Sequence, residues 1–293
     1  MNRENEHVLS EQKMGIIIEL VKKKKELSGV SKKIIENEVD IFLKQEKKIR
    51  NTLIIKERID RSSAADLVVK HVRKRLHMRH GVFQEESKNR SELAKKIKNI
   101  SDIENTKRIL ETHASTKERI SYYSDFYKKI FSETNNPKSI LDLGCGMNPF
   151  SIPFMKLAVV PVYYANDIND DDCNILQKYF EKMHIEGICK TFDLQVLRKT
   201  EHFPFPPVDV CFLFKVLDSI ETTSGHKFAE KIITHLQAKY IIATFATKTV
   251  SGKHMIHPFR GWIERMLNRI EYPFKRIEFS NELVYIIKKG ERV

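Results

Sequence analysis

The stretch Ser139–Phe150, SILDLGCGMNPF, decides the fold of this 293-residue chain. Its first residues continue an apolar run that suits a buried parallel strand, and Asp142 ends that strand. Gly144 and Gly146 indicate a sharp turn, or a place where a ligand approaches the main chain closely. The Asn148-Pro149 pair can then open a helix, with the asparagine as N-cap. A tight turn without a ligand is the alternative, but this order predicts a nucleotide-type ligand at the edge of an α/β sheet.

A second acidic strand end supports this interpretation. Val160–Asp167, VPVYYAND, is rich in Val and Tyr and ends in Asp167. A carboxylate at the end of the second strand can accept both hydroxyl hydrogens of a ribose. Taken alone, an aspartate at a strand end is an ordinary turn residue. Beside the glycine turn, we expect it to bind ribose.

Strands and helices alternate from residue 138 onward, which indicates a mostly parallel sheet covered on both faces. We expect strands near 138–142, 161–166, 188–193, 208–214, 239–245, 273–279 and 282–288, and helices over 149–157, 170–183, 225–236 and 258–269. The last two strands are joined by Ser280-Asn281, which is too short for a helical crossover, so they should pair antiparallel. The fold class is therefore α/β, a doubly wound Rossmann-like sheet of seven strands with the last one antiparallel.

The first part of the chain has helical spacing and an excess of positive charge. Net charge is +13, and residues 1–137 hold 31 Lys and Arg against 21 Asp and Glu. A helix that begins at Ser62 or Ser63, where Ser63 and Asp66 resemble a capping pair, becomes strongly basic over Lys70–His80. Such side chains bind phosphate oxygens without reading sequence. A solvated helix face is the alternative; we expect RNA binding by Lys70, Arg73, Lys74, Arg75 and Arg79.

Composition narrows the class of protein further. No apolar run approaches the roughly 20 residues that span a bilayer, and the polar, mixed-charge start MNRENEHVLS is unlike a signal peptide. The four cysteines lie in or beside apolar segments without CxxC or CxxH spacing. We therefore expect reduced core cysteines, a cytoplasmic protein, and neither a structural zinc nor another metal.

Several motifs in one order point to a known family. They are RLHMRHGVF, HASTKER, SILDLGCGMNPF, FLFKVLDSIE, ATFATKTVSGK and NELVYIIKKG, spread over residues 75–290. Together they resemble the 16S ribosomal RNA guanine-N7 methyltransferases that confer aminoglycoside resistance, which are class I S-adenosylmethionine-dependent enzymes. The resemblance implies a basic helical RNA-binding domain over 1–110, and a methyltransferase domain over 111–293 that uses S-adenosyl-L-methionine.

The resemblance also implies a cofactor site. Arg119 would pair with the methionine carboxylate, as a guanidinium fork can, although the sequence alone would favour a surface arginine. Asp193 would accept from the adenine amino group, or else simply cap the end of its strand. The full expected set is Arg119, Asp142, Gly144, Gly146, Asp167, Asp193 and Leu194, with Leu194 lining the adenine pocket.

The target base should lie at the end of the fourth strand, at Phe214 and Lys215. A lysine after an apolar run must point into the cleft or pair with an acid such as Asp218, and we assign it to holding the target nucleotide. In the loop Thr247–His257, Lys248 and Lys253 are further candidates for RNA contact. Ala246, just before this loop, stands where the family often has proline.

Guanine N7 has a lone pair and no proton to lose, so methyl transfer needs alignment and exclusion of water rather than a general base. We expect a monomer that acts on the 30S subunit. The alternatives are methylation of another RNA or of a decoding-site adenine, and a non-catalytic RNA-binding or ribosome-assembly factor. The sequence does not distinguish a resistance role from a housekeeping role.

Overall fold

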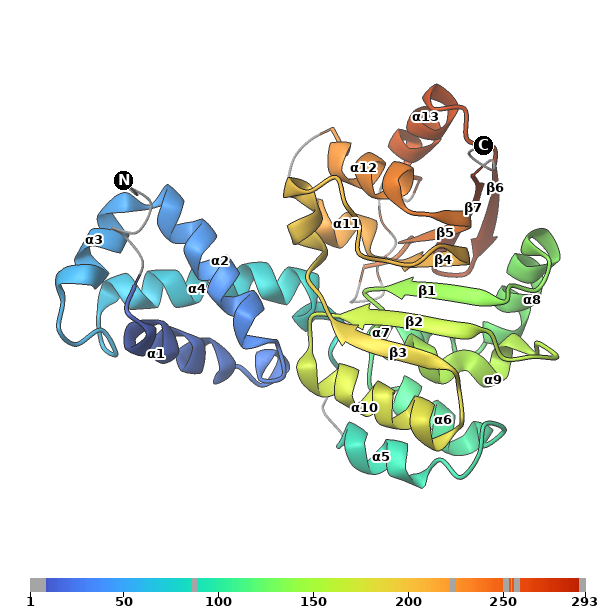
Figure 1. The fold of residues 1–293 in the computed structure, drawn as a ribbon, viewed down its shortest axis with the longest axis horizontal. Coiled ribbons are helices and arrows are strands. Elements are labelled where there is room, and N and C mark those ends of the chain that lie inside the picture. Colours follow the sequence, from blue (N-terminus) through green and yellow to red (C-terminus); the bar gives the residue numbers. More distant parts are fainter. Residues whose placement is uncertain are drawn as a thin grey trace. The chain divides into compact units, whose positions relative to one another are not determined.

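The computed structural model describes residues 9–85, 89–221, 225–249, 253, 255 and 259–289. The chain forms two compact units, drawn in Figure 1. The helical unit is Met1–Val82 together with Ile168–Asp171, and the α/β unit is Phe83–Asp167 with Asp172–Val293. The boundary after residue 82 differs from the predicted boundary after residue 110. The reason is that the helices between these two positions pack on the core of the α/β unit.

The α/β unit is built on a seven-stranded sheet with the order β3-β2-β1-β4-β5-β7-β6. β7 runs antiparallel to β5 and β6, and the other neighbours pair parallel. This confirms the predicted fold class. The strands are β1 (Ser139–Leu143), β2 (Val162–Asp167), β3 (Gly187–Thr191), β4 (Val208–Phe214), β5 (Ala238–Ala246), β6 (Phe274–Phe279) and β7 (Glu282–Lys288).

Helices cover both faces of this sheet (Figure 1). One apolar core joins it to α5 (Arg90–Lys96), α6 (Ile103–Leu110), α8 (Tyr123–Thr134), α9 (Ile152–Met155) and α10 (Asp170–Lys182). A second core joins the other face to α11 (Leu217–Ile220), α12 (Lys227–His235) and α13 (Gly261–Arg269). Because both faces are buried, the inner strands read as continuous apolar runs, and this is why their positions could be predicted.

The helical unit consists of α1 (Glu11–Lys22), α2 (Lys32–Gln45), α3 (Lys47–Ile55) and α4 (Ser63–Arg79) around an apolar core of their own. Ser62 caps α4, since its hydroxyl accepts from the Ala65 amide at 3.2 Å. This confirms the predicted start of the basic helix, although the cap is Ser62 rather than Ser63.

Within the described part of the chain, no helix is long and apolar enough to cross a membrane. All four cysteines are free and buried, which confirms the prediction of reduced core residues. The pKa of each thiol is raised above its usual value, by burial for Cys145 and Cys211, and by hydrogen bonds to neighbouring cysteines together with burial for Cys173 and Cys189. The described residues also contain no group of three or more His, Cys, Asp or Glu that could hold a metal.

Candidate cofactor and target-base site

The carboxyl ends of the parallel strands bring the predicted acids to one edge of the sheet. Asp142 lies in β1 opposite Ala165 of β2 and Phe212 of β4. Asp167 is the last residue of β2, and Asp193 follows β3 by two residues. Parallel strands end at the same edge, where ligands of open α/β sheets bind.

The glycine turn after β1 is required by the protein's own packing. Gly144 and Gly146 have φ of 66° and 50°, in the left-handed region that favours glycine. A Cβ on Gly144 would lie 2.9 Å from Val216 Cγ2, and one on Gly146 would lie 2.6 Å from His113 Nε2. Both residues are therefore needed whether or not a ligand is bound, and their contact with a cofactor stays a prediction.

The two downstream acids are both almost fully buried, with 6% of each residue exposed. Asp167 Oδ2 accepts from the Gly146 amide at 2.9 Å, which ties the end of β2 to the glycine turn. Asp193 caps the 3₁₀ helix Leu194–Lys199 by accepting from the Gln195 amide at 2.9 Å. Leu194 packs in the apolar core beside it. The capping role of Asp193 is thus present, and its adenine contact stays a prediction.

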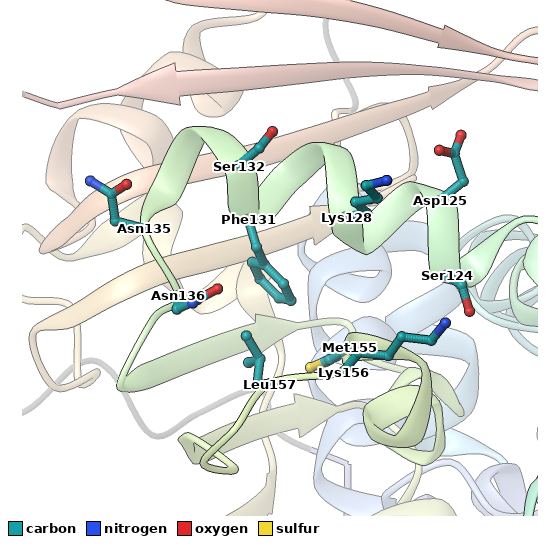
Figure 2. A pocket seen from close by; sticks show the side chains of 10 residues that line it. All are labelled: Ser124, Asp125, Lys128, Phe131, Ser132, Asn135, Asn136, Met155, Lys156 and Leu157. Atoms are coloured by element: carbon teal, nitrogen blue, oxygen red, sulfur yellow. The ribbon is translucent and has the colours of Figure 1, made fainter.

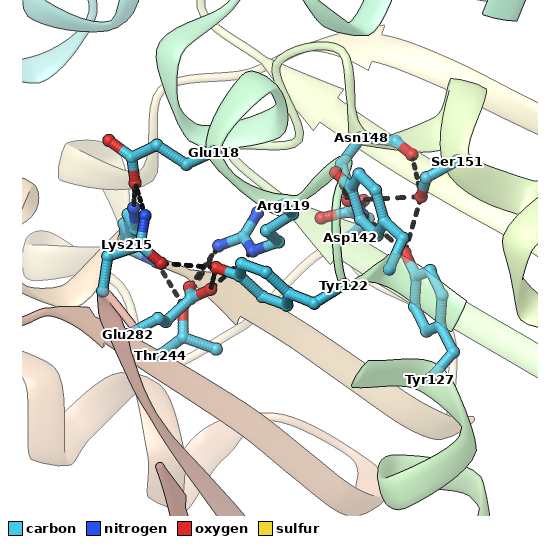
Figure 3. Close-up of polar contacts among 12 residues, drawn as sticks. Glu118, Arg119, Tyr122, Tyr127, Asp142, Asn148, Ser151, Lys215, Thr244 and Glu282 are labelled. Atoms are coloured by element: carbon cyan, nitrogen blue, oxygen red, sulfur yellow. Dashed lines mark hydrogen bonds and ion pairs between the residues drawn. The ribbon is translucent and has the colours of Figure 1, made fainter. Parts of the chain in front are cut away.

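Arg119, at the end of α7 (Ala114–Arg119), is fully buried rather than on a helix surface. Its Nε donates to Glu282 Oε2 at 2.7 Å, its Nη2 donates to Glu282 Oε1, and Nη2 also lies 3.3 Å from Thr244 Oγ1 (Figure 3). Burial lowers the pKa of Arg119, but the charge of Glu282 outweighs this and leaves the pKa raised. The remaining nitrogen, Nη1, is buried and has no hydrogen-bond partner among the described residues. The nearby Tyr123 hydroxyl donates to Asn148 instead, at 3.0 Å.

Asp142 presents the complementary case of an unpaired acceptor. Its Oδ2 accepts from Asn148 Nδ2 at 2.8 Å and from the Tyr163 hydroxyl at 2.7 Å. Its Oδ1 is buried and without a partner in the described part of the chain. Burial raises the pKa of Asp142 to about 6, although the two hydrogen bonds and the charge of Arg119 act in the opposite direction. The prediction that Asn148 is an N-cap was wrong: Met147 holds the cap position, because the Asn148 side chain is used by Asp142.

These two orphaned atoms fit the amino-acid end of the expected cofactor. An unpaired buried N–H or carboxylate oxygen costs free energy until a ligand satisfies it. Arg119 Nη1 could donate to a carboxylate, and Asp142 Oδ1 could accept from an α-ammonium group. The residues present therefore suit the methionine moiety of S-adenosylmethionine.

Lys215 follows β4 in a left-handed conformation, with φ of 60°, and only 8% of it is exposed. Its amide lies 3.1 Å from both the Thr244 hydroxyl and the Thr244 carbonyl oxygen, and its Nζ forms an ion pair with Glu118. The suggestion that Lys215 could pair with Asp218 was wrong, because Asp218 forms an ion pair with Arg260 at 2.9 Å. A strained, non-glycine backbone held in this way is typical of functional positions.

Phe214 ends β4 and is buried beside this group. The guanidinium carbon of Arg119 lies 4.7 Å from the centre of the Phe214 ring. The structure thus places the predicted carboxylate-binding arginine in contact with one of the two predicted target-base residues.

The five predicted RNA-binding residues of α4 divide into two groups. Arg75 and Arg79 each form an ion pair at 2.6 Å with Glu38, which is only 1% exposed, and Arg73 donates to carbonyl oxygens at the end of α1. Lys70 and Lys74 are exposed. Three of the five side chains therefore hold the helical unit together, and two are directed to solvent.

The loop after β5 is described only in part. Lys253 is exposed and its carbonyl oxygen accepts from the Thr249 amide at 2.8 Å, and Lys248 is half-buried. His254 and His257 lie outside the described residues. The RNA contacts of this loop stay predictions.

Several residues of this site were missed by the sequence analysis. Glu282, which holds Arg119, and Glu118, which holds Lys215, were not singled out, nor was His113, whose ring lies on Gly146. A signal for Glu282 existed, since it is an acid at the start of a strand whose next five residues, LVYII, are apolar or aromatic. Its partner lies 163 residues earlier, and no local pattern identifies that partner.

A cavity of about 620 Å³ lies elsewhere, beside α8 (Figure 2). Phe131, Met155 and Leu157 form its apolar lining, with polar residues such as Lys128 and Asn136 around them. None of the predicted cofactor-binding residues lines it, so it is separate from the site described above.

Comparisons with known proteins show which family the chain belongs to. The profile of a family described as ribosomal RNA methyltransferase (FmrO) matches residues 51–286. A protein of Micromonospora rosea named 16S rRNA (guanine(1405)-N(7))-methyltransferase is 30% identical over 185 residues, which is 62% of this chain and 65% of that protein. The Proteus mirabilis protein of the same name is 27% identical over 250 residues, 75% of this chain and 83% of its own length. The chain thus spans less than two thirds of the Micromonospora relative.

Solved structures share the fold. The 16S rRNA methyltransferase RmtF, crystallised in complex with S-adenosyl-L-homocysteine, aligns with a TM-score of 0.70 at 18% identity over 96% of this chain and 99% of that chain. The 16S rRNA methylase RmtB aligns with a TM-score of 0.68 at 19% identity over 94% and 98% of the two chains. Because the family profile covers most of its length, this chain belongs to the ribosomal RNA methyltransferase (FmrO) family.

Proposed function

We propose that this protein transfers a methyl group from S-adenosyl-L-methionine to N7 of a guanine in 16S ribosomal RNA. The observation that carries the proposal is the pair of orphaned atoms, Arg119 Nη1 and Asp142 Oδ1, at the sheet edge of a chain in this family. The curated relatives carry this activity in their names. Together these support a small-subunit RNA substrate and a cytoplasmic site of action.

The residues divide the work of holding the cofactor. Arg119 would bind the methionine carboxylate and Asp142 the α-ammonium group. Asp167 would accept from the ribose hydroxyls, and Asp193 from the adenine amino group, with Leu194 against the base. The cofactor supplies a methyl group on a sulfonium that N7 attacks directly. The protein has only to align the base and exclude water.

Phe214 and Lys215 would meet the target guanine, which must leave its helix to reach the edge of the sheet. The left-handed backbone at Lys215 and its ion pair with Glu118 keep the lysine in place at the end of β4. The lysine charge would then lie near the nucleotide's phosphate or base. Lys70 and Lys74 would contact RNA phosphates, as would Lys248 and Lys253.

The experiment is tritium transfer from labelled S-adenosylmethionine to 30S subunits, followed by mapping of the modified base. We expect incorporation by the wild type and a loss of at least about a hundredfold in Asp167→Ala, because a charged hydrogen-bond acceptor is removed. Equal, background-level incorporation by both proteins would reject the proposal. Modification of an adenine or of another RNA would retain the enzyme but replace its substrate.

A further inference from the structure

The helical unit contains four residues from far along the chain, Ile168–Asp171. The Ser31 amide donates to the Ile168 carbonyl at 3.0 Å, and the Asp170 amide donates to the Gly29 carbonyl at 2.9 Å. These two bonds flank an antiparallel bridge between Val30 and Asn169. Ile168 packs against the apolar core of the helices. The segment is thus built into the helical unit through both its main chain and its side chains.

The side chain of Asn169 is the centre of this arrangement. Only 6% of Asn169 is exposed, and its Nδ2 lies 3.1 Å from Nε2 of the buried His80. A Cβ added to Gly29 would lie 2.4 Å from Asn169 Oδ1 and 2.8 Å from Nδ2. Gly29 does not have a positive φ, so its backbone would accept other residues. The absence of a side chain at Gly29 therefore makes room for the Asn169 amide.

Asp167, which we assign to the ribose, directly precedes this segment. Its side chain accepts from the Gly146 amide at 2.9 Å, and its carbonyl oxygen accepts from the Phe192 amide at 2.9 Å. Consecutive Cα atoms are only about 3.8 Å apart, so a shift of the segment is transmitted to the end of β2. Within the α/β unit, the side chain and the main chain of Asp167 are thus each held by one hydrogen bond.

We propose that Asn169 is a positioning residue for cofactor binding, which acts by holding the chain immediately after Asp167 against Gly29 and His80. This inference rests on the proposed function, because it requires Asp167 to bind the ribose. It assigns Asn169, and the segment Ile168–Asp171 that contains it, a role in placing the residue before it. Small displacements of a binding group are sufficient to weaken a ligand, since hydrogen bonds depend steeply on geometry.

The test uses the full chain and S-adenosylhomocysteine as the probe. Gly29→Ala should raise the dissociation constant measured by calorimetry about tenfold, in the range of one hydrogen bond's net contribution. The matched control is Gly15→Ala, where no atom lies within 4 Å of the added Cβ, and it should stay within about twofold of wild type. Turnover at saturating cofactor should change much less than KM for the cofactor in Gly29→Ala.

Asn169→Ala provides the second arm, because it only removes atoms, and the side chain that an alanine at position 29 would clash with is then absent. Alone it should also weaken binding, by about tenfold. In the Asn169→Ala background, Gly29→Ala should have little further effect, which gives a strong coupling between the two positions. Unchanged dissociation constants in both folded single variants would overturn the inference. Failure of the wild type to bind the probe would instead remove the proposed function.

Discussion

Asp142 offers the sharpest test of the site, because its ionised carboxylate should destabilise the folded protein and at the same time strengthen cofactor binding. Burial raises its pKa from 3.8 to about 6 in the folded protein. Between these two values the folded state holds more protons than the unfolded state, so stability falls as pH rises through this window. Well below pH 3.8 both states are protonated and the cost is absent; well above pH 6 both are ionised and the cost is complete.

The size of this cost follows from the shift. One pKa unit corresponds to about 1.4 kcal/mol, so the shift corresponds to a cost of about 3 kcal/mol at pH 8. Asp142→Asn removes the charge but can still accept from Asn148 and Tyr163. Its amide nitrogen is left without a partner, at a cost that does not vary with pH. About 0.5 kcal/mol of the cost is already present at pH 4, so the difference between variant and wild type should move in favour of the variant by about 2.5 kcal/mol from pH 4 to pH 8.

The assay is urea denaturation of both proteins at pH 4, 5, 6, 7 and 8. Asp209→Asn is the matched control with the opposite sign. Burial raises the pKa of Asp209, but its bond with Lys239 and the amides of Lys138 and Ser139 outweigh this and lower it. Asp209 should thus stabilise the folded wild type at neutral pH, and this stabilisation should be lost as the pH falls toward its lowered pKa. A variant-to-wild-type difference for Asp142→Asn that is the same at every pH would refute the reasoning.

Cofactor affinity should show the converse behaviour. The dissociation constant of S-adenosylhomocysteine should fall as pH rises through about 6, because an ionised Asp142 accepts from the α-ammonium group. This pH dependence should be absent in Asp142→Asn, which should also bind about ten- to a hundredfold more weakly at pH 8. Affinity equal to wild type would show that the orphaned oxygen does not face the ligand.

Three further outcomes follow from the described contacts. Glu282→Gln should destabilise the protein by about 3 kcal/mol in urea denaturation, because Arg119 is left buried without a counter-charge; replacing both by apolar residues should recover stability but not cofactor binding. The double change Lys70→Gln and Lys74→Gln should leave the free energy of unfolding within about 0.5 kcal/mol of wild type. It should reduce the slope of the logarithm of 30S affinity against the logarithm of salt concentration by about 2. Arg79→Met should instead lower the urea concentration at which the protein unfolds, because the buried Glu38 then has one ion-pair partner fewer. The four cysteines should react with a thiol reagent only after denaturation, since all four are buried and the pKa of each thiol is raised; rapid labelling of the native protein would contradict this.

The sequence by itself determined the sheet. The buried strands are continuous apolar runs, and the turn after β1 needs glycine at two left-handed positions, so both leave local marks that can be read without a structure. The acids at the strand ends were also found from sequence, because parallel topology brings strand ends to one edge. All four of Asp142, Gly144, Gly146 and Asp167 are gathered there.

Only the tertiary structure decided which charged side chains form ion pairs within the protein and which stay available to a ligand. Glu282 accepts hydrogen bonds from two nitrogens of Arg119, and the third nitrogen stays available for a ligand. Glu38 forms ion pairs with Arg75 and Arg79, so these two arginines are not part of the solvent-exposed basic face of α4. Neither choice has a local signature, because an ion pair depends on distance in space and these partners lie 163, 37 and 41 residues apart. Burial, which sets the pKa of Asp142, is likewise a property of the packed molecule rather than of the residues on either side of it.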